Sequence, residues 1–196
     1  QNIVEKPDKL KNYAGIIHEQ TSHLQSQVQR LLEIAYTDRS SLPLKKEKFD
    51  INLLIKESIN DLHPLIEQRH AVVHTNFGEQ NVLINADRSY LRLCLINLVE
   101  NAIKYSNEPV IDVSTRVEGN VLLIAVKDNG IGIAAEHQKK IFERFYRVTD
   151  GELHISKGFG LGLNFVKKVI DTHHGRIEVA SELGSGSIFT IKLSLK

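Results

Sequence analysis

Two asparagines, Asn97 and Asn101, stand four residues apart in a stretch whose apolar residues recur with the period of an α-helix. Two glycine-punctuated turns follow it, over residues 128–132 and 158–163. Side chains four residues apart share one face of a helix, and glycine turns let a ligand approach the backbone closely. A helix that offers two amides and the ammonium of Lys104, set against two such turns, is able to hold a metal ion and a triphosphate.

The overall composition is that of an ordinary globular protein, with 41% hydrophobic and 25% charged residues among 196. A net charge of +1 gives no basic field that would favour nucleic acid as a partner. The single cysteine, Cys94, excludes a disulfide within the chain and is expected to be a core thiol. No apolar run is long enough to span a bilayer and no signal peptide is visible. The lack of a disulfide fits a reducing compartment such as the cytoplasm, and we expect no direct membrane contact by these residues.

The first part of the chain differs from the rest in the spacing of its apolar residues. Residues 8–36 are predicted to form one helix with a heptad repeat, carried by Leu10, Ile17, Leu24 and Leu31. The repeat gives the helix a narrow apolar face, which favours packing against a partner helix. Packing against its own domain is the alternative. The break at Pro43 predicts a division into residues 1–43 and 44–196, with self-association through residues 10–35. The start at Gln1 and the lack of methionine indicate a piece of a longer protein.

Beyond the break, helices and short strands mix. A helix capped by Asp50 is expected from Ile51 to about Glu67, a second from Asp87 through Lys104, and a third after Gly162 that Gly175 ends. Strands are expected over residues 71–75, 82–84, 110–116, 121–127, 177–179 and 187–195.

The second helix carries the clearest chemistry. At about 100° per residue, one face is apolar and the opposite face is polar; the apolar face holds Leu91, Leu95, Leu98 and Ala102, and the polar face Asn97, Glu100, Asn101 and Lys104. A solvated face is the ordinary interpretation. Asparagine is a poor helix former, however, so the pair indicates another purpose. An amide oxygen suits Mg²⁺, and a lysine one turn further along suits phosphate.

The two turns have weaker signals when each is taken alone. Asp128 ends an apolar strand and could accept a hydrogen bond from an adenine amine, although Asp-Asn-Gly is itself an ordinary turn signal. Residues 158–163 open into an apolar-periodic helix, whose first amides could bind phosphate. Between the turns, Phe142 and Phe145 are expected to dock in the core, leaving the neighbouring arginines for an anion. Residues 148–157 are expected to form a mobile lid.

Together these segments resemble the catalytic and ATP-binding domain of bacterial sensor histidine kinases. Residues 97–105 resemble the N box of that family, 128–133 its first glycine box, 141–147 its F box, 158–163 its second glycine box and 184–187 its last. The long first helix resembles the second helix of the family's dimerisation and phosphotransfer hairpin. The implied fold is a two-layer α/β sandwich, in which helices cover one face of a mixed sheet.

The resemblance also implies roles for individual residues. Asn101 would bind Mg²⁺, Asn97 would support the triphosphate, and Lys104 and Arg147 would contact phosphate. Tyr105 would stack beside adenine and Asp128 would accept from its amino group. Asn97 and Lys104 are the implied catalytic residues. The remaining implied ATP-binding residues are Gly130, Gly132, Gly158, Gly160, Leu161, Gly162 and Leu163.

The implied activity is transfer of the ATP γ-phosphoryl group to a histidine, followed by relay to an aspartate of a response regulator. The acceptor histidine lies on a helix that this sequence lacks, and the similarity of His18-Glu19 to the acceptor motif is attributed to chance. The chain alone is therefore expected to bind ATP without phosphorylating itself.

Two other functions remain open at this point. An ATP-operated clamp of the gyrase or chaperone kind would use a glutamate four residues before the metal-binding asparagine, where this chain has Asn97. A nucleotide-binding module without activity is the other alternative. Positioning and charge neutralisation suffice for phosphoryl transfer, so the absence of a water-activating base favours the kinase.

Overall fold

The computed structural model describes residues 42–78, 81–148 and 160–195. The chain divides into two units, Gln1–Ser40 and Ser41–Lys196, and the described residues all belong to the second. The predicted helix over residues 8–36, Gly158 and all but the first residue of the predicted lid lie outside the described residues. No helix within the described ranges has both the length and the apolar character needed to cross a membrane.

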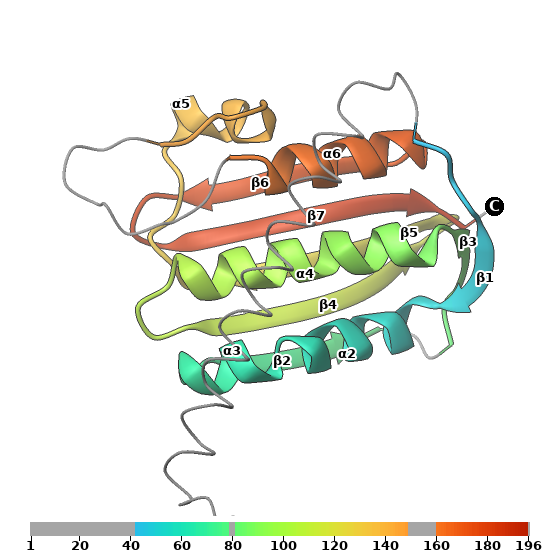
Figure 1. Ribbon diagram of the computed structural model, residues 1–196, viewed down its shortest axis with the longest axis horizontal. Helices are drawn as coiled ribbons and strands as arrows, with labels where there is room; N and C mark the ends of the chain where they lie inside the picture. The colour runs from blue at the N-terminus through green and yellow to red at the C-terminus, as the bar shows by residue number, and fades with distance from the viewer. Residues whose placement is uncertain (1–41, 79–80, 149–159, 196) are drawn as a thin grey trace, which may run out of the picture. The chain divides into compact units, whose positions relative to one another are not determined.

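The main sheet has five strands in the order β2-β4-β5-β7-β6 (Figure 1). Its strands are β2 (Val72–Phe77), β4 (Val110–Glu118), β5 (Val121–Asp128), β6 (Arg176–Glu182) and β7 (Gly186–Ser194). β2 runs parallel to β4, and the other pairs are antiparallel. The sheet is therefore mixed. A separate antiparallel pair joins β1 (Glu47–Asp50) to β3 (Leu83–Ala86).

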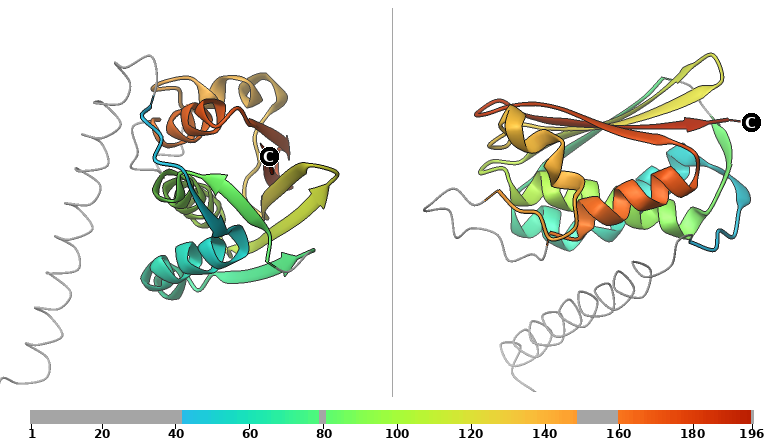
Figure 2. Two further views of the ribbon diagram at one scale, coloured as in Figure 1. Left: turned by 90° about the vertical axis from the view of Figure 1, so that its right-hand side faces the viewer. Right: turned by 90° about the horizontal axis from the view of Figure 1, so that it is seen from above.

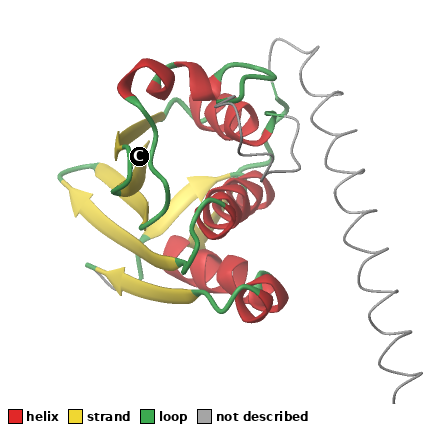
Figure 3. Cartoon of the chain, turned by 90° about the vertical axis from the view of Figure 1, so that its left-hand side faces the viewer, coloured by secondary structure: helices red, strands yellow, loops and turns green. Residues whose placement is uncertain are grey.

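The helices cover one face of this sheet. They are α2 (Ile51–Asp61), α3 (His63–Gln68), α4 (Arg88–Lys104), α5 (Ala135–Gln138), the 3-10 turn η1 (Lys140–Phe142) and α6 (Gly162–Thr172). Figure 2 shows α2, α4 and α6 side by side beneath the strands, and the end-on view of Figure 3 separates the same two layers. The expected two-layer sandwich is confirmed.

Alternation along the strands explains why only one face is covered. Ile111, Val113 and Thr115 of β4 are buried, whereas Asp112 and Arg116 between and beside them are exposed. β5 and β7 alternate in the same way, with buried residues at every second position. An antiparallel sheet with period-two patterning buries one face and leaves the other in solvent. The helices therefore have one apolar surface on which to pack.

Helix α4 lies in the middle of the helical layer, between α2 and α6 (Figure 1). Asp87 caps its first turn as predicted, because its Oδ1 accepts from the Tyr90 N–H at 3.0 Å. The predicted apolar face is buried, and so are Cys94, Val99 and Ile103, which flank it. Burial on both flanks follows from having a helix on each side. Burial also raises the pKa of the Cys94 thiol, as expected of a core thiol.

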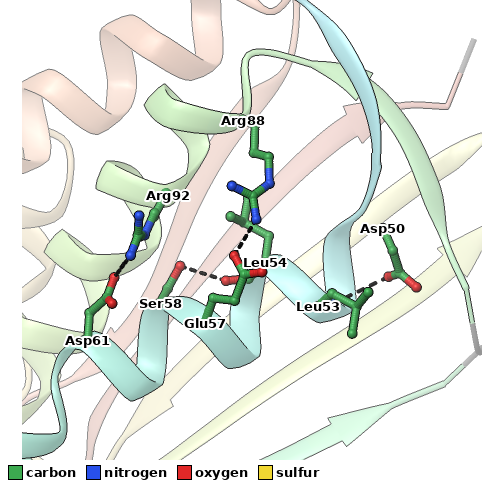
Figure 4. Close-up of polar contacts among 8 residues, drawn as sticks. All are labelled: Asp50, Leu53, Leu54, Glu57, Ser58, Asp61, Arg88 and Arg92. Carbon is green, nitrogen blue, oxygen red and sulfur yellow. Dashed lines mark hydrogen bonds and ion pairs between the residues drawn. The ribbon is translucent and has the colours of Figure 1, made fainter.

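Helices α2 and α4 are joined on their exposed sides by two ion pairs, Glu57 with Arg88 and Asp61 with Arg92 (Figure 4). Each helix contributes residues four positions apart, so the two pairs lie one turn apart along both helices. Exposed ion pairs contribute little to stability. The register of α2 on α4 is therefore set mainly by the buried residues Leu54, Ile55 and Ser58 beneath them.

The expected helix from Ile51 to Glu67 is wrong in one respect, because it is two helices. Leu62 ends α2, and α3 begins at His63 with a proline, Pro64, in its first turn. Proline lacks an N–H and its ring clashes with the carbonyl four residues earlier, here that of Asn60. The chain therefore starts a new helix where proline is tolerated.

The end of α6 also differs from expectation. His174, not Gly175, has the left-handed backbone conformation, with φ 57°. The N–H of Gly175 donates to Ile170 O and that of His174 to Asp171 O, which together form a Schellman motif. Gly175 is needed for space, since a Cβ there would lie 2.6 Å from Lys192 O. Elsewhere the strands differ from expectation at their ends, and β1 and α5 were not predicted.

A buried histidine, His173, joins the end of α6 to the start of α4. Its Nδ1 lies 2.8 Å from Val169 O and its Nε2 accepts from the Asp87 N–H at 2.9 Å. A carbonyl only accepts and an amide N–H only donates, so the proton is on Nδ1 and the ring is neutral. Burial lowers the pKa of His173, with an opposing effect from the Val169 carbonyl.

Asp87 also holds the chain that enters the domain. Its Oδ2 accepts from the Lys45 N–H at 2.8 Å. Leu42, three residues earlier, is only 3% exposed. Residues 42–45 are therefore packed as part of the described unit, and the start of α4 is a meeting point for the entering segment and α6.

Candidate functional site

Asn97 lies in the contact between α4 and α6. It is 8% exposed, and its Nδ2 donates to the carbonyl of Leu93 at 3.0 Å within the same helix. Its Oδ1 lies beside Gly162, the first residue of α6, where an added Cβ would be only 2.5 Å from that oxygen. The polar face of α4 is therefore not uniformly open to solvent, because Asn97 is enclosed by α6.

The next turn of α4 is more open. Asn101 is partly exposed, Lys104 is exposed, and Tyr105, which ends the helix, is 44% exposed. The Lys104 ammonium lies 2.7 Å from the Glu100 carboxylate, one turn back. The two polar residues at this end, Asn101 and Lys104, thus offer an amide oxygen and a cation at a surface that a ligand can reach.

Asp128 ends β5 and is buried. Its Oδ1 accepts from the N–H groups of Gly130 at 2.8 Å and Ser187 at 3.2 Å. Burial raises the pKa of this carboxyl, and the two amide hydrogen bonds partly offset that effect. Both bonds reach Oδ1, and neither occupies Oδ2. A held carboxylate of this kind can accept a hydrogen bond from a ligand amine.

The glycine turn after Asp128 is fastened to α4. The N–H of Ile131 donates to the carbonyl of Tyr105 at 3.0 Å. A Cβ at Gly130 would lie 2.5 Å from the same carbonyl oxygen and 2.9 Å from Asp128 Oδ1. Only glycine fits between these groups. The turn therefore brings Asp128 and the carboxyl end of α4 into one site, as the sequence predicts.

The same turn is held on its other side by the β6–β7 connection. The N–H of Gly184 donates to Ile131 O at 2.7 Å. Gly132 has a left-handed backbone, φ 70°, and a Cβ there would overlap the carbonyl oxygen of Glu182. The turn is wedged between α4 and the β6–β7 connection, so its shape is fixed without a ligand.

A hollow of about 330 Å³ has Asp128, Ser181 and Ser187 in its lining. The lining also includes Lys127, Ala180 and Ile188, which alternate with the buried strand residues and so face the side without helices. Asn101 and Gly162 are not part of it. We therefore place the candidate nucleotide site on the helical side, where the residues with the matching chemistry lie.

The segment over residues 141–147 only partly follows expectation. Phe142 is partly buried, with its ring edge-on to that of Phe189 at a centroid distance of 6.4 Å. The prediction that Phe145 docks in the core is wrong, because this side chain is 58% exposed. Phe145 has a left-handed backbone, φ 64°, which turns its ring outward beneath the guanidinium of Arg144. Arg147 is exposed, as a phosphate contact requires.

The second glycine turn is described from Gly160 onward. Gly160 has φ 68° and its carbonyl accepts from the Phe145 N–H at 3.0 Å. Leu161 is buried and precedes α6, which has no side-chain cap at its first turn. Gly162 and Leu163 begin the helix and are partly exposed. Uncapped amides at a helix N-terminus suit an anion such as phosphate.

Ser187 was missed as a site residue, although its glycine-rich neighbourhood was recognised. Its N–H binds Asp128, and its hydroxyl lies 2.9 Å from that of Ser181. Gly186 beside it has φ 88°, which lets the β7 backbone pass close to Asp128 O. The available signal was the cluster Gly184-Ser185-Gly186-Ser187. This cluster alone does not indicate that Ser187 binds Asp128.

The donor set limits what metal could bind. Within the described ranges there is no group of three histidine, cysteine or acidic side chains that could hold a metal ion. Mg²⁺ commonly takes one or two protein oxygens and completes its shell with phosphates and water. An amide such as that of Asn101 fits this pattern, provided that a phosphate ligand is present.

Comparison with known proteins agrees with this geometry. The model of the family described as histidine kinase-, DNA gyrase B-, and HSP90-like ATPase matches residues 86–196. The sensor protein RprX of Bacteroides fragilis (strain YCH46) is 39% identical over 196 residues, covering 98% of this chain and 38% of RprX. The sensor protein SrrB of Staphylococcus aureus (strain NCTC 8325 / PS 47) is 32% identical over 193 residues, covering 97% of this chain and 33% of SrrB. The chain thus spans well under half of either relative.

Solved structures show the same fold. The catalytic domain of histidine kinase ThkA, free of nucleotide, has a TM-score of 0.69 and 25% identity, covering 77% of this chain and 96% of that one. A structure of histidine kinase ThkA in complex with the response regulator protein TrrA has a TM-score of 0.72 and 26% identity. The match covers 98% of this chain and 53% of the ThkA chain.

Proposed function

The chain belongs to the histidine kinase-, DNA gyrase B- and HSP90-like ATPase family, with an ATP-binding domain of the sensor histidine kinase type; from this premise we propose its reaction. The domain transfers the γ-phosphoryl group of Mg-ATP to a histidine that these residues do not supply. A response-regulator aspartate then receives the group. The structure of ThkA with a response regulator supports such a partner.

One observation carries the proposal. The hydrogen bond from Ile131 N–H to Tyr105 O fixes the Asp128 turn against the end of the helix that carries Asn101 and Lys104. A carboxylate for adenine, an amide for the metal ion and an ammonium for phosphate thus belong to one rigid site. We assign Asp128 to the adenine amine, Tyr105 to the adenine ring and Lys104, Arg147 and the first turn of α6 to phosphate.

Within this site the chain binds and orients the nucleotide. Asn101 supplies an amide oxygen to the metal ion, and a bound Mg²⁺ neutralises charge on the phosphates. Lys104 exchanges its partner Glu100 for a phosphate oxygen, since the ion pair is exposed and costs little to break. Asn97 stays in the contact with α6 and supports the phosphate-binding end of that helix. Phosphoryl transfer needs this positioning and charge neutralisation above all.

We also propose how the chain is organised. Residues 1–43 contribute a partial dimerisation and phosphotransfer helix and its linker, and residues 44–196 the catalytic domain. The heptad pattern over residues 10–35 supports self-association through that helix. The division of the chain between Ser40 and Ser41 supports a boundary close to residue 43. The catalytic domain works in the cytoplasm, where ATP and response regulators are found.

The test compares Asn101→Ala with Asn60→Ala, an exposed helical asparagine of α2 that serves as the matched control. Calorimetry with Mg-ATP should show an affinity about tenfold to 100-fold lower for Asn101→Ala and unchanged for the control. With a phosphoacceptor helix restored, labelled ATP should give acid-labile phosphate in the control only. Unchanged Mg-ATP affinity in Asn101→Ala would contradict the metal role, and steady hydrolysis by the chain alone would favour a clamp-type ATPase.

A further inference from the structure

We propose that His137 and Tyr146 form a positioning pair that holds the phosphate-binding end of the site without touching the nucleotide. This inference rests on the proposed function and deepens it. The Tyr146 hydroxyl lies 2.6 Å from His137 Nδ1, and the two rings are tilted with centroids 6.1 Å apart. His137 is on α5, and Tyr146 immediately precedes Arg147, the proposed phosphate contact.

The histidine side of the pair is fixed to the adenine end of the site. Gln138, next to His137, donates through Nε2 to Ile133 O at 3.0 Å and to Ser181 O at 2.7 Å. The N–H of Ile133 in turn donates to Ser181 Oγ at 2.8 Å. Helix α5 is therefore attached both to the glycine turn after Asp128 and to β6.

The attachment continues to the adenine carboxylate itself. Ser181 Oγ lies 2.9 Å from Ser187 Oγ, and the N–H of Ser187 binds Asp128. A row of hydrogen bonds thus leads from Asp128 through β7 and β6 to α5. Between the Asp128 carboxylate and the Gln138 amide, each member is a backbone group or a short hydroxyl, so the row has little freedom to shift.

The tyrosine side of the pair is fixed to the start of α6. The N–H of Phe145 donates to Gly160 O at 3.0 Å, and a Cβ at Gly160 would lie 2.7 Å from Tyr146 O. Phe145 has the left-handed conformation that a bulky side chain rarely adopts. Surrounding contacts must hold such a conformation in place. The bond to His137 is a side-chain contact that ties this turn to α5.

The pair therefore links the two ends of the site through α5. His137 is a suitable holder because its side chain is only 20% exposed. Without the bond, the backbone that presents Arg147 loses a constraint, while the Asp128 turn keeps its own bonds to α4. Binding of the phosphate groups should weaken and binding of the base should not.

The experiment measures binding of Mg-ATP and of adenosine by calorimetry. Variants His137→Leu and Tyr146→Phe remove the bond, the double variant removes both partners, and His137→Asn restores a polar group near the position of Nδ1. The control is His63→Leu. Like His137, His63 lies near a glutamate, in this case Glu67. It belongs to α3, which lies beside β2 at the other edge of the sheet (Figure 1).

Each single variant should bind Mg-ATP about fivefold more weakly and adenosine equally well, with little change in melting temperature without nucleotide. The double variant should be no worse than either single one, because both remove the same bond. His137→Asn should bind Mg-ATP within about twofold of the parent chain, and His63→Leu should match the parent.

Three results would overturn the positioning role: parental Mg-ATP affinity in both single variants, an equal loss for adenosine, or losses that multiply in the double variant. Failure of His137→Asn to recover affinity would also count against it. Failure of the parent chain to bind Mg-ATP at all would instead overturn the proposed function, and this inference with it.

Discussion

The amide oxygen of Asn97 and the α-carbon of Gly162 are in such close contact that no side chain fits between them, since a Cβ at residue 162 would lie 2.5 Å from Asn97 Oδ1. Asn97 cannot easily move away, because its Nδ2 is bonded to Leu93 O. The approach of α6 to α4 is therefore set by an asparagine and a glycine.

Gly162→Ala tests this contact. Alanine favours a helix over glycine by up to about 1 kcal/mol, but the clash should outweigh that gain and leave a net loss of about 1 kcal/mol. Urea denaturation measures the difference. Combining it with Asn97→Ala should recover most of the stability, because the obstructing oxygen is gone. A Gly162→Ala chain that is more stable than its parent while Asn97 is present would refute the contact.

Gly132→Ala should be far more disruptive than Gly119→Ala. Both glycines have left-handed backbones, with φ 70° and 60°, but an added Cβ at Gly119 meets nothing within 4 Å. Gly119→Ala should cost about 1 kcal/mol for backbone strain alone, and Gly132→Ala about 3 kcal/mol or more because it also displaces the β6–β7 connection. The midpoints of urea denaturation measure both losses of stability. Equal losses would show that the close contact of Gly132 with the β6–β7 connection is unimportant.

Asp128→Asn should separate stability from binding. Burial raises the pKa of Asp128, so its stabilising effect is present when it is protonated and is lost as pH rises through that pKa. Removing the charge should leave the melting temperature at pH 7 unchanged or slightly higher. ATP affinity should fall about 100-fold, because an amide nitrogen would face the adenine amine. Asp112→Asn, at an exposed position of β4, is the control, and intact binding in Asp128→Asn would contradict the assignment.

His173→Gln should reduce the loss of stability in acid. Burial lowers the pKa of His173 below 6.5, so the unfolded chain takes up the proton first and stability falls as pH drops below about that value. Lys46 and His174 oppose protonation further, and Asp87 favours it. Glutamine can still accept from the Asp87 N–H but does not titrate. Between pH 7 and pH 5 the variant should lose about 2 °C less in melting temperature than its parent, and identical profiles would refute this role.

The residues that the sequence places correctly are those whose chemistry depends on neighbours in the chain. The Asp87 cap, the apolar face of α4 and the alternation along β4, β5 and β7 follow from local periodicity. The mixed sheet and its helical cover came from the resemblance and are confirmed. Pro64 was a local signal too, and the break that it causes could have been predicted.

The features that escaped prediction depend on partners far away in the chain. Phe145 reads as an apolar residue in an apolar segment, and only the bond of its N–H to Gly160 O shows why its ring turns outward. Asn97 belongs to the polar face of α4 by periodicity, yet α6 covers it. His173 and the pair of His137 with Tyr146 are isolated polar residues in the sequence, and no pattern names their partners.

Lys45 and His173 bind the same residue, Asp87: the Lys45 N–H donates to its carboxylate, and its own backbone N–H donates to His173. The entering segment, the first turn of α4 and the last turn of α6 therefore meet at one residue. Asn101 and Gly162, which we assign to the nucleotide site, lie toward the opposite ends of those two helices, so the junction at Asp87 holds α4 and α6 together at the ends away from the proposed site.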